Sequence, residues 1–236
     1  MTRQVVIVGG GVIGLLTALN LAADVEHVVV CDKGELGGES SWAGGGIVSP
    51  LYPWRYSPAV TALAHWSQDF YPQLGEQLLG STGVDPQVHV TGLYWLDLED
   101  ESEALAWAER EGRPLSKVAV AEAYAAVPVL GPGFSSAVYM AGVANVRNPR
   151  LLKSLKAALL ALPNVTLKEH CEITGFVHEG ERIAGVRTTN GTLEADTVVL
   201  TAGAWSGDLL RPLGLSLPVE PVKGPVSYTH LTLPTK

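Results

Sequence analysis

The sequence predicts an α/β fold built on a parallel sheet, and three apolar segments support this. The β-branched run Gln4–Val8 is followed by glycines and then by apolar residues at helical spacing over Val12–Ala23. Val28–Cys31 is a second apolar run, typical of a strand that is covered on both faces. Far downstream, Asp196–Leu200 leads an apolar strand into small residues. We therefore expect a β-α-β unit and a later strand that returns to the same edge of the sheet.

Helices and strands are expected along the rest of the chain. In the first half we expect helices over Pro58–Leu79 with an interruption at Pro72, over Glu101–Arg110 and over Val118–Ala126, and a strand over Val88–Leu98. Asn148 and Pro149 are typical of a helix start, with Leu151–Leu162 as its apolar face. We then expect strands over Val165–Leu167, Ile173–Val177 and Ile183–Thr188, a hairpin turn at Asn190–Gly191 into a strand over Thr192–Thr201, and a helix over Ala204–Leu210.

Composition excludes several classes of function. The 236 residues carry a net charge of −8, so we expect no nucleic-acid partner. Cys31 and Cys171 lack disulfide or zinc-ligand spacing and are expected in the core, and the six histidines have no metal-ligand spacing. No segment is long and apolar enough for membrane insertion, and no secretory signal is present, so we expect a cytoplasmic protein.

A glycine motif follows the first predicted strand. Gly9, Gly11 and Gly14 form a GxGxxG pattern that opens the first predicted helix, and Asp32 ends the next strand 18 positions later. In this context Gly9 permits a tight turn, Gly11 lets the backbone approach a pyrophosphate, and Gly14 lets the helix pack closely. Asp32 can accept a hydrogen bond from a ribose hydroxyl. The alternative is a glycine turn in a plain β-α-β unit, but the full context favours a dinucleotide site.

Two further segments favour a long ligand. Residues 34–47 hold six glycines, which disfavour a regular helix across the stretch and suit a backbone pressed against an extended ligand. Ser40 and Ser41 offer hydroxyl donors to a pyrophosphate or ribityl chain. The small residues after the last strand, with Ala202, Gly203 and Trp205, add a third segment at the sheet edge. We interpret this as favouring flavin over nicotinamide, with a flexible surface loop as the alternative for residues 34–47.

Five segments together resemble one known family. These segments are Gly9–Gly14, Glu39–Pro50, Leu51–Tyr56, Thr201–Trp205 and Pro221–Gly224. Through them the sequence over residues 1–225 is similar to the FAD-dependent amino-acid oxidases of the D-amino-acid oxidase superfamily, and within it to the glycine oxidases of the thiamine pathway. The resemblance implies a Rossmann-like FAD-binding domain with an interleaved antiparallel-sheet substrate domain, which is incomplete here.

The resemblance also implies roles for single residues. Val12 and Ile13 match positions at the FAD pyrophosphate, and Asp32 and Lys33 match positions around the adenosine ribose, where the family usually has Glu in place of Asp32. The remaining matches are Ser40 and Ser41 at the cofactor, Gly45, Gly46 and Ile47 beside the isoalloxazine ring, and Ile173 on the adenine side.

The activity that the resemblance implies is oxidative deamination of glycine or another small amino acid. A hydride passes from the α-carbon to the flavin, water hydrolyses the imine to a 2-oxo acid and ammonia, and dioxygen reoxidises the flavin to give hydrogen peroxide. No side-chain acid, base or nucleophile is required, so we assign no catalytic residue. The full-length protein is expected to form a homo-oligomer.

The substrate pocket is incomplete in this sequence. The family's carboxylate-binding arginine comes later than the segment matching Pro225. Tyr52 and Arg55 are candidates for the pocket mouth, although a surface role for Arg55 is equally compatible with its loop. A D-amino-acid or sarcosine dehydrogenase or oxidase, with a dehydrogenase passing electrons to a membrane quinone, remains an alternative, as does an inactive nucleotide-binding fragment.

The predicted domains are discontinuous. Residues 1–82 and 144–215 are expected to form the FAD-binding domain, and residues 83–143 and 216–225 part of the substrate domain. Residues 226–236 depart from the family pattern and resemble a translated sequencing adapter, so we interpret them as a foreign tail on a truncated product.

Overall fold

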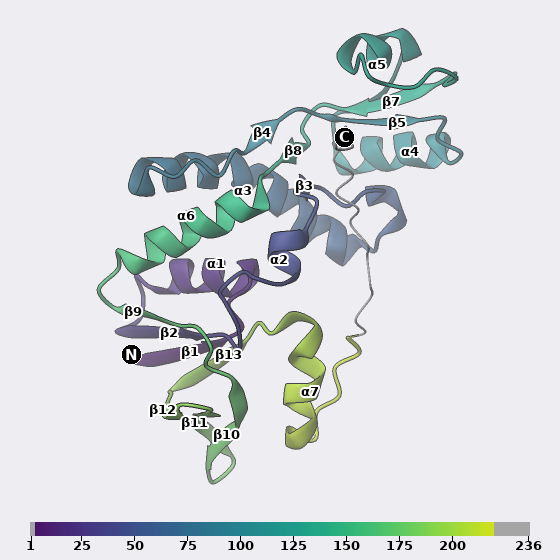
Figure 1. Cartoon of the computed structure of the whole chain (residues 1–236). Coiled ribbons are helices and arrows are strands. Elements are labelled where there is room, and N and C mark those ends of the chain that lie inside the picture. The colour runs from purple at the N-terminus through teal and green to yellow at the C-terminus, as the bar shows by residue number, and fades with distance from the viewer. Residues whose placement is uncertain (1–2, 220–236) are drawn as a thin grey trace, which may run out of the picture. The chain divides into compact units, whose positions relative to one another are not determined.

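The computed structural model describes residues 3–219, which form two compact units (Figure 1). The first unit takes in residues 3–45, Ser81–Pro86 and 148–219. The second takes in Gly46–Gly80 and Gln87–Arg147. The predicted foreign tail, 226–236, lies outside the described residues.

The division into units differs from the predicted domains chiefly at residues 46–80. The sequence grouped this stretch with the FAD-binding part, whereas in the structure it belongs to the second unit. The physical reason is aromatic packing, because the ring of Trp54 lies 5.4 Å from that of Trp95 and 6.5 Å from that of Trp107, centroid to centroid. Smaller differences fall at residues 83–86, 144–147 and 216–219. The assignment of the units to FAD and substrate stays a prediction.

A four-stranded parallel sheet is the centre of the first unit. Its strand order is β13-β1-β2-β9, with β1 at Gln4–Val8, β2 at His27–Cys31, β9 at Val165–Lys168 and β13 at Thr197–Leu200. The predicted β-α-β unit is confirmed, and so is the return of the downstream strand to the same sheet. Because all four strands are parallel, their carboxyl ends lie at one edge.

Helices cover one face of this sheet and a second sheet covers the other (Figure 1). Helix α1 (Val12–Leu21) packs against α6 (Asn148–Leu160), whose predicted start at Asn148 is confirmed. On the opposite face lies the antiparallel sheet β10 (Ile173–Glu179), β11 (Arg182–Thr188) and β12 (Gly191–Glu194). The core between the two sheets holds alternate residues of the central strands with side chains of the second sheet, among them Val6, Val8, Val29, Cys31, Cys171, Ile173, Phe176 and Val186.

The strand predicted over Thr192–Thr201 is wrong as a single element. It divides into β12, which completes the antiparallel sheet, and β13, which joins the parallel sheet. The break is fixed at Asp196, whose Oδ2 accepts the backbone N–H groups of Arg3 at 3.0 Å and Gln4 at 2.9 Å. The hydrogen bonds from Gln4 and Arg3 lower the pKa of Asp196. After β13 the chain forms a 3-10 turn at Gly203–Trp205, helix α7 (Ser206–Leu210) and a second 3-10 turn at Arg211–Leu213.

The second unit is built on two small antiparallel sheets. One has the order β3-β8-β4 and the other β5-β7-β6. The helices are α3, α4 and α5, with a 3-10 turn at Pro53–Arg55. The bounds are β3 Ile47–Val48, β4 His89–Val90, β5 Leu93–Leu96, β6 Leu115–Val118, β7 Ala137–Met140, β8 Ala144–Asn145, α3 Pro58–Thr82, α4 Glu101–Glu111 and α5 Val120–Ala126.

Three predictions in this unit need correction. The strand predicted over Val88–Leu98 is broken at Gly92, which has a φ of +75°. The N–H groups of Thr91 and Gly92 both donate to the Val143 carbonyl, which ends the ladder there. Pro72 lies inside α3 without interrupting it, and α5 begins at Val120 because Val118 pairs in β6. Among the described helices, none combines the length and apolarity needed to cross a membrane.

Candidate functional site

Neighbouring backbone leaves no room for a side chain at Gly9, in the turn between β1 and α1, or at Gly14, in the first turn of α1. Gly9 has a φ of +108°, and a Cβ atom on it would lie 2.5 Å from the carbonyl oxygen of Thr201. A Cβ on Gly14 would lie 1.9 Å from the Gly9 oxygen. The Thr201 hydroxyl donates to that same Gly9 oxygen at 2.8 Å. The start of α1, the turn and the end of β13 are therefore in direct backbone contact at the carboxyl edge of the sheet.

Asp32 holds the turn from the end of β2. Its Oδ2 accepts the N–H of Gly10 at 2.7 Å, and its Oδ1 accepts the N–H of Gly34 at 2.9 Å. A carboxylate has about four lone-pair sites, so both oxygens keep acceptor capacity for a ligand hydroxyl. The side chain that the sequence assigned to a ribose thus also fixes the backbone of the glycine turn, a role that sequence reasoning missed.

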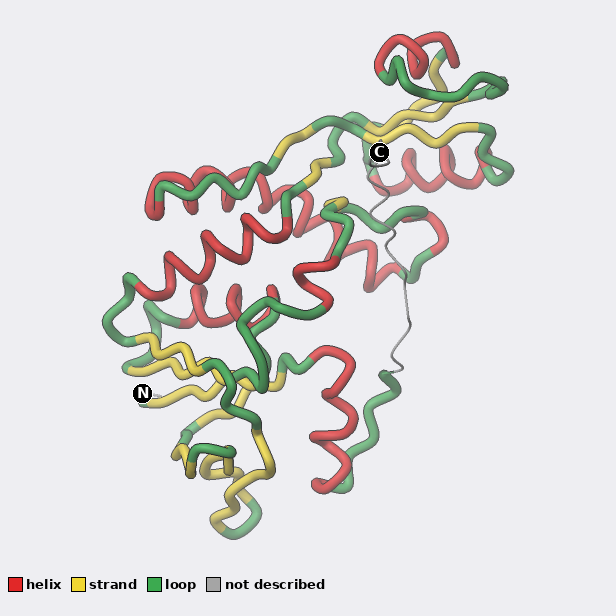
Figure 2. Tube along the Cα trace, in the orientation of Figure 1, coloured by secondary structure: helices red, strands yellow, loops and turns green. Residues whose placement is uncertain are grey.

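Ser41 is placed against the first turn of α1. The connection after β2 is mostly loop, with α2 (Ser40–Ala43) as a single helical turn (Figure 2). The Ser41 Oγ accepts the N–H of Val12 at 2.9 Å and therefore caps an amide at the start of α1. Its hydroxyl hydrogen remains available to a ligand. The positive end of the α1 dipole and a hydroxyl donor are consequently brought together, an arrangement that suits an anion.

A cavity of about 380 Å³ opens at this edge of the sheet. Most of the residues predicted to bind a cofactor line it: Gly9, Gly11, Val12, Ile13, Asp32, Lys33, Ser40, Ser41, Ile173, Ala202, Gly203 and Trp205. Sequence reasoning missed the other lining residues, which are Val8, Cys31, Glu39, Cys171, Glu172, Thr201, Ala204, Asp208 and Leu209. Several of these residues are adjacent in sequence to predicted ones. Their position next to a motif could therefore have been used to predict them.

Four predicted cofactor residues are not among the lining residues. Gly14 lies beneath the turn, where its contact is with backbone. Gly45 belongs to the first unit, whereas Gly46 and Ile47 belong to the second. Gly46 has a φ of +73° and its carbonyl accepts the Val146 N–H at 2.8 Å, next to the pairing of β3 with β8. The predicted flavin contacts of Gly45, Gly46 and Ile47 stay predictions.

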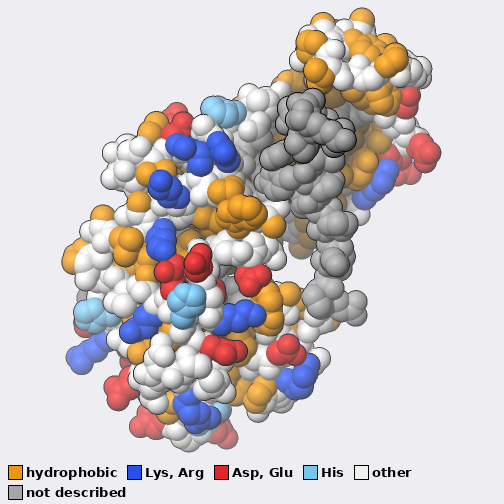
Figure 3. Space-filling view, in the orientation of Figure 1, with side chains coloured by type: hydrophobic (Ala, Val, Ile, Leu, Met, Phe, Trp, Pro, Cys, Tyr) orange, Lys and Arg blue, Asp and Glu red, His pale blue; other side chains and the backbone are white. Residues whose placement is uncertain are grey.

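Two side-chain pairs form parts of the cavity wall. The Lys33 Nζ lies 3.6 Å from the ring centroid of Trp205, so a cation–π contact joins the end of β2 to the turn after β13. Cys31 and Cys171 are buried in the core as predicted, and they also line the cavity. Burial, with Cys171 as its neighbour, raises the pKa of Cys31 to about 12, so that this thiol stays protonated at neutral pH. Acidic and basic side chains are intermingled on the visible face of the first unit (Figure 3).

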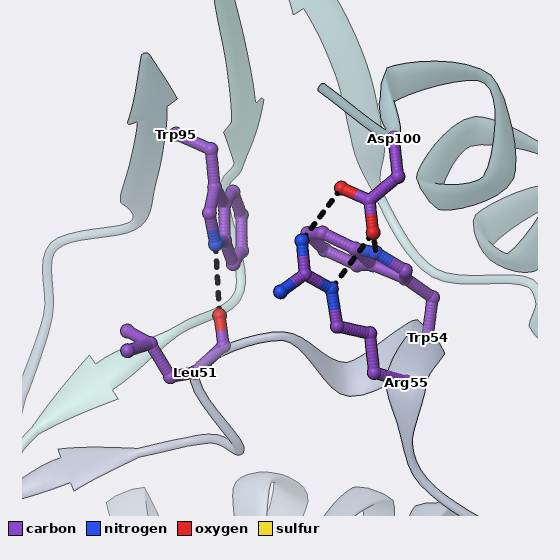
Figure 4. A network of polar contacts seen from close by, with 5 residues as sticks. All are labelled: Leu51, Trp54, Arg55, Trp95 and Asp100. Carbon is purple, nitrogen blue, oxygen red and sulfur yellow. Dashed lines mark hydrogen bonds and ion pairs between the residues drawn. The ribbon is translucent and has the colours of Figure 1, made fainter. Parts of the chain in front are cut away.

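The predicted substrate residues Tyr52 and Arg55 lie in the second unit, where Arg55 belongs to a network of polar contacts (Figure 4). The Arg55 Nε donates to the Asp100 Oδ2 at 2.7 Å and its Nη2 to the Oδ1 at 2.9 Å. The Trp54 indole donates to the same Oδ2 at 2.7 Å, and the Arg55 guanidinium lies over the Tyr52 ring at 4.1 Å. The hydrogen bonds from Arg55 and then Trp54 lower the pKa of Asp100 to about 2.

This network gives Arg55 a full bidentate partner within its own unit. A bidentate arginine–carboxylate pair is the strongest common geometry for a guanidinium, so release of Arg55 toward a substrate carboxylate requires breaking it. The participation of Tyr52 and Arg55 in substrate binding stays a prediction. In the same network, the Trp95 indole donates to the Leu51 carbonyl at 2.8 Å and fixes the loop that carries these residues.

Comparison with known proteins decides the family. The family model of FAD-dependent oxidoreductases, DAO, matches residues 4–235. The chain belongs to this family. The DAO match includes residues that we assigned to a foreign tail, and that assignment stays a prediction.

Close relatives within the DAO family are glycine oxidases. The chain is 80% identical over 224 residues to glycine oxidase from Pseudomonas putida and 63% identical over 224 residues to that from Pseudomonas aeruginosa, covering 95% of this chain in each case. The chain spans 61% and 62% of the lengths of these two proteins. The crystal structure of glycine oxidase from Geobacillus kaustophilus is 31% identical, with a TM-score of 0.81 over 92% of this chain and 60% of that one.

The residues present fit the FAD that defines the DAO family. A pyrophosphate needs close approach to backbone and an anion-binding helix start, and the turn supplies both where Cβ atoms are excluded. Asp32 retains acceptor capacity for a ribose, while Lys33 and Trp205 supply a cation and an aromatic face. Of the two kinds of predicted site, the cofactor site is therefore the one whose residues mostly line a cavity.

Proposed function

We propose that this protein catalyses FAD-dependent oxidative deamination of glycine or another small amino acid. The observation that carries the proposal is the 80% identity to glycine oxidase of Pseudomonas putida over 224 residues. The proposed reaction converts glycine, water and dioxygen to glyoxylate, ammonia and hydrogen peroxide. When bound, FAD supplies the two-electron chemistry, accepting a hydride from the amino-acid α-carbon and passing two electrons to dioxygen.

The described residues serve binding and orientation in this proposal. The amides at the start of α1, with the Ser40 and Ser41 hydroxyls, hold the pyrophosphate, and Asp32 with Lys33 holds the adenosine ribose. Ile173 and the segment with Ala202, Gly203 and Trp205 close the adenine side. The thiol of Cys31 adds no charge to this wall, because burial keeps it protonated.

The first unit is accordingly proposed as the FAD-binding domain and the second as part of the substrate domain. We assign the carboxylate-binding arginine of the family to a segment beyond the residues that match here, with Tyr52 and Arg55 as further candidates. We also propose dioxygen as the electron acceptor, the thiazole branch of thiamine synthesis as the product's destination, a cytoplasmic location and a homo-oligomeric full-length enzyme.

Product analysis of the full-length protein tests the proposal. With glycine under air, we expect glyoxylate, ammonia and hydrogen peroxide in equal amounts. Reduction of a quinone dye without peroxide would instead show a dehydrogenase. Bound FAD without turnover of glycine, sarcosine or D-amino acids would contradict the proposed enzymatic activity and leave a nucleotide-binding module. Size-exclusion chromatography of the same preparation tests the proposed oligomer.

A further inference from the structure

Gly10 is held from three directions, although it occupies a variable position of the GxGxxG pattern. Its N–H donates to the Asp32 Oδ2 at 2.7 Å, and its carbonyl accepts the N–H of Gly37 at 2.9 Å. A Cβ atom on Gly10 would lie 1.9 Å from the Cδ2 of Leu36, so the leucine side chain occupies that space. The segment after β2 is therefore packed directly onto the turn that faces the cavity.

Leu36 is in turn hydrogen-bonded to the residue that follows β9, the strand that pairs with β2. The Oε1 of Glu169, the residue after β9, accepts the backbone N–H of Leu36 at 3.0 Å. The same oxygen accepts the Nζ of Lys156, on α6, at 2.6 Å. The Glu169 side chain is 31% exposed, and neither Glu169 nor Lys156 is among the residues that line the cavity. A line of contacts thus runs from α6 through Glu169 and Leu36 to Gly10.

Backbone hydrogen bonds hold this segment at Asp32, Gly34, Glu35 and Gly37, whereas the acceptor of the Leu36 amide is a side chain, that of Glu169. The Cys171 N–H donates to the Asp32 carbonyl at 2.7 Å, and the His170 N–H donates to the Gly34 carbonyl at 3.1 Å. The residues after β9 contact Leu36 through a side chain, because the Glu169 carboxylate accepts the Leu36 N–H. The side chain of Glu169 therefore extends the pairing to the residue that covers Gly10.

We propose that Glu169 is a positioning residue for FAD. By fixing the Leu36 amide it holds the leucine side chain over Gly10 and keeps the phosphate-binding turn in its binding shape. Lys156 pairs with the same carboxylate oxygen, and among the described contacts it makes none with the Leu36 segment. The inference rests on the proposed function only in that FAD is the ligand of the cavity.

Equilibrium titration of full-length apoprotein with FAD, followed by flavin fluorescence, tests this proposal. Glu169→Ala removes the acceptor for the Leu36 amide and should raise the Kd for FAD about 5- to 10-fold. Leu36→Ala removes the side chain over Gly10 and should raise it by a similar factor. Glu169→Gln keeps an acceptor oxygen and Lys156→Met keeps the carboxylate, so each should stay within about 2-fold of the unaltered protein.

A matched control and a second measurement separate positioning from general destabilisation. Glu179 also pairs with a basic side chain, Arg182, at 3.0 Å on the β10–β11 hairpin, so Glu179→Ala should leave the Kd unchanged. Hydrogen exchange of the apoprotein should quicken at the Leu36 amide in Glu169→Ala and not in Lys156→Met or Glu179→Ala. An unchanged Kd in Glu169→Ala or Leu36→Ala would overturn the proposal, as would equal effects in Glu169→Ala and Lys156→Met. If the unaltered protein bound no FAD, the proposed function would fail instead, and the exchange measurement would still test the tie to Leu36.

Discussion

The glycine turn of the first unit and the Tyr52–Arg55 loop of the second were both expected to bind ligands, but the structure satisfies their polar groups differently. At the turn, Asp32 and Ser41 hold backbone amides and keep lone pairs or a donor directed at a cavity. At the loop, the Arg55 guanidinium is paired with Asp100 through two hydrogen bonds. At the turn, the same side chains can stabilise the fold and still bind a ligand. At the loop, Arg55 can bind a ligand carboxylate only after its stabilising pair with Asp100 is broken.

The largest expected effect comes from filling the space at Gly14. Gly14→Ala places a Cβ 1.9 Å from the Gly9 carbonyl oxygen, which is backbone and cannot move aside without distorting the turn. We expect at least a roughly 100-fold loss of FAD affinity, equivalent to about 2.7 kcal/mol. Gly131→Ala is the matched control, because a Cβ there meets nothing within 4 Å. Normal FAD binding by Gly14→Ala would contradict the described packing of turn and helix.

Removal of the Asp32 charge should have the next largest effect. Asparagine offers one acceptor oxygen in place of two, so Asp32→Asn leaves the amide of Gly10 or Gly34 unpartnered. We expect the Kd for FAD to rise about 10- to 100-fold, as for loss of a hydrogen bond to a charged group. Asp97 is a matched control, since its Oδ1 accepts the N–H groups of Ser135 and Ser136 at 2.9 Å each in the second unit. Equal losses of FAD affinity in Asp32→Asn and Asp97→Asn would remove the distinction between the two regions.

The Asp100 network predicts a stability effect with a defined pH dependence and little effect on FAD. The folded-state pKa of the Asp100 carboxyl group is about 2, below its ordinary value of 3.8. The stabilisation that this carboxylate contributes is therefore present above pH 3.8 and is lost as the pH falls through 2. Asp100→Asn should therefore lower the Tm at pH 7 by a few degrees, and the difference from the unaltered protein should shrink between pH 4 and pH 2. Thermal scans across this range test it. A difference that grows as the pH falls would contradict the assigned pairing.

The Lys33–Trp205 contact should produce the smallest change. A cation–π pair at a partly exposed site contributes about 0.5–1 kcal/mol, so Lys33→Met should raise the Kd for FAD about 2- to 5-fold. Trp205→Phe keeps a ring and should change it less. Lys117, which pairs with Glu101 at 2.8 Å in the second unit, provides the control as Lys117→Met. A loss as large as that of Asp32→Asn would place the decisive contact at Lys33 instead of the turn.

The sequence predicted the parts of this protein that local chemistry determines. The β-α-β unit and its glycine turn were readable because apolar runs, glycine spacing and Asp32 fall within about 30 residues of one another. The division of Thr192–Thr201 between two sheets was not readable, since it depends on Asp196 contacting Arg3 and Gln4, which lie 193 and 192 residues away in the chain. The partner of Arg55 was missed for the same reason, because Asp100 is brought to it by folding and carries no local pattern.

Titration of full-length apoprotein with FAD tests the central claim most directly, namely that the turn at Gly9–Gly14 grips a flavin dinucleotide. We predict saturable binding at one FAD per chain, with the flavin absorbance shifted on binding and the affinity lost in Gly14→Ala. Folded protein that stays colourless after dialysis against FAD would contradict the claim, as would equal affinity in Gly14→Ala.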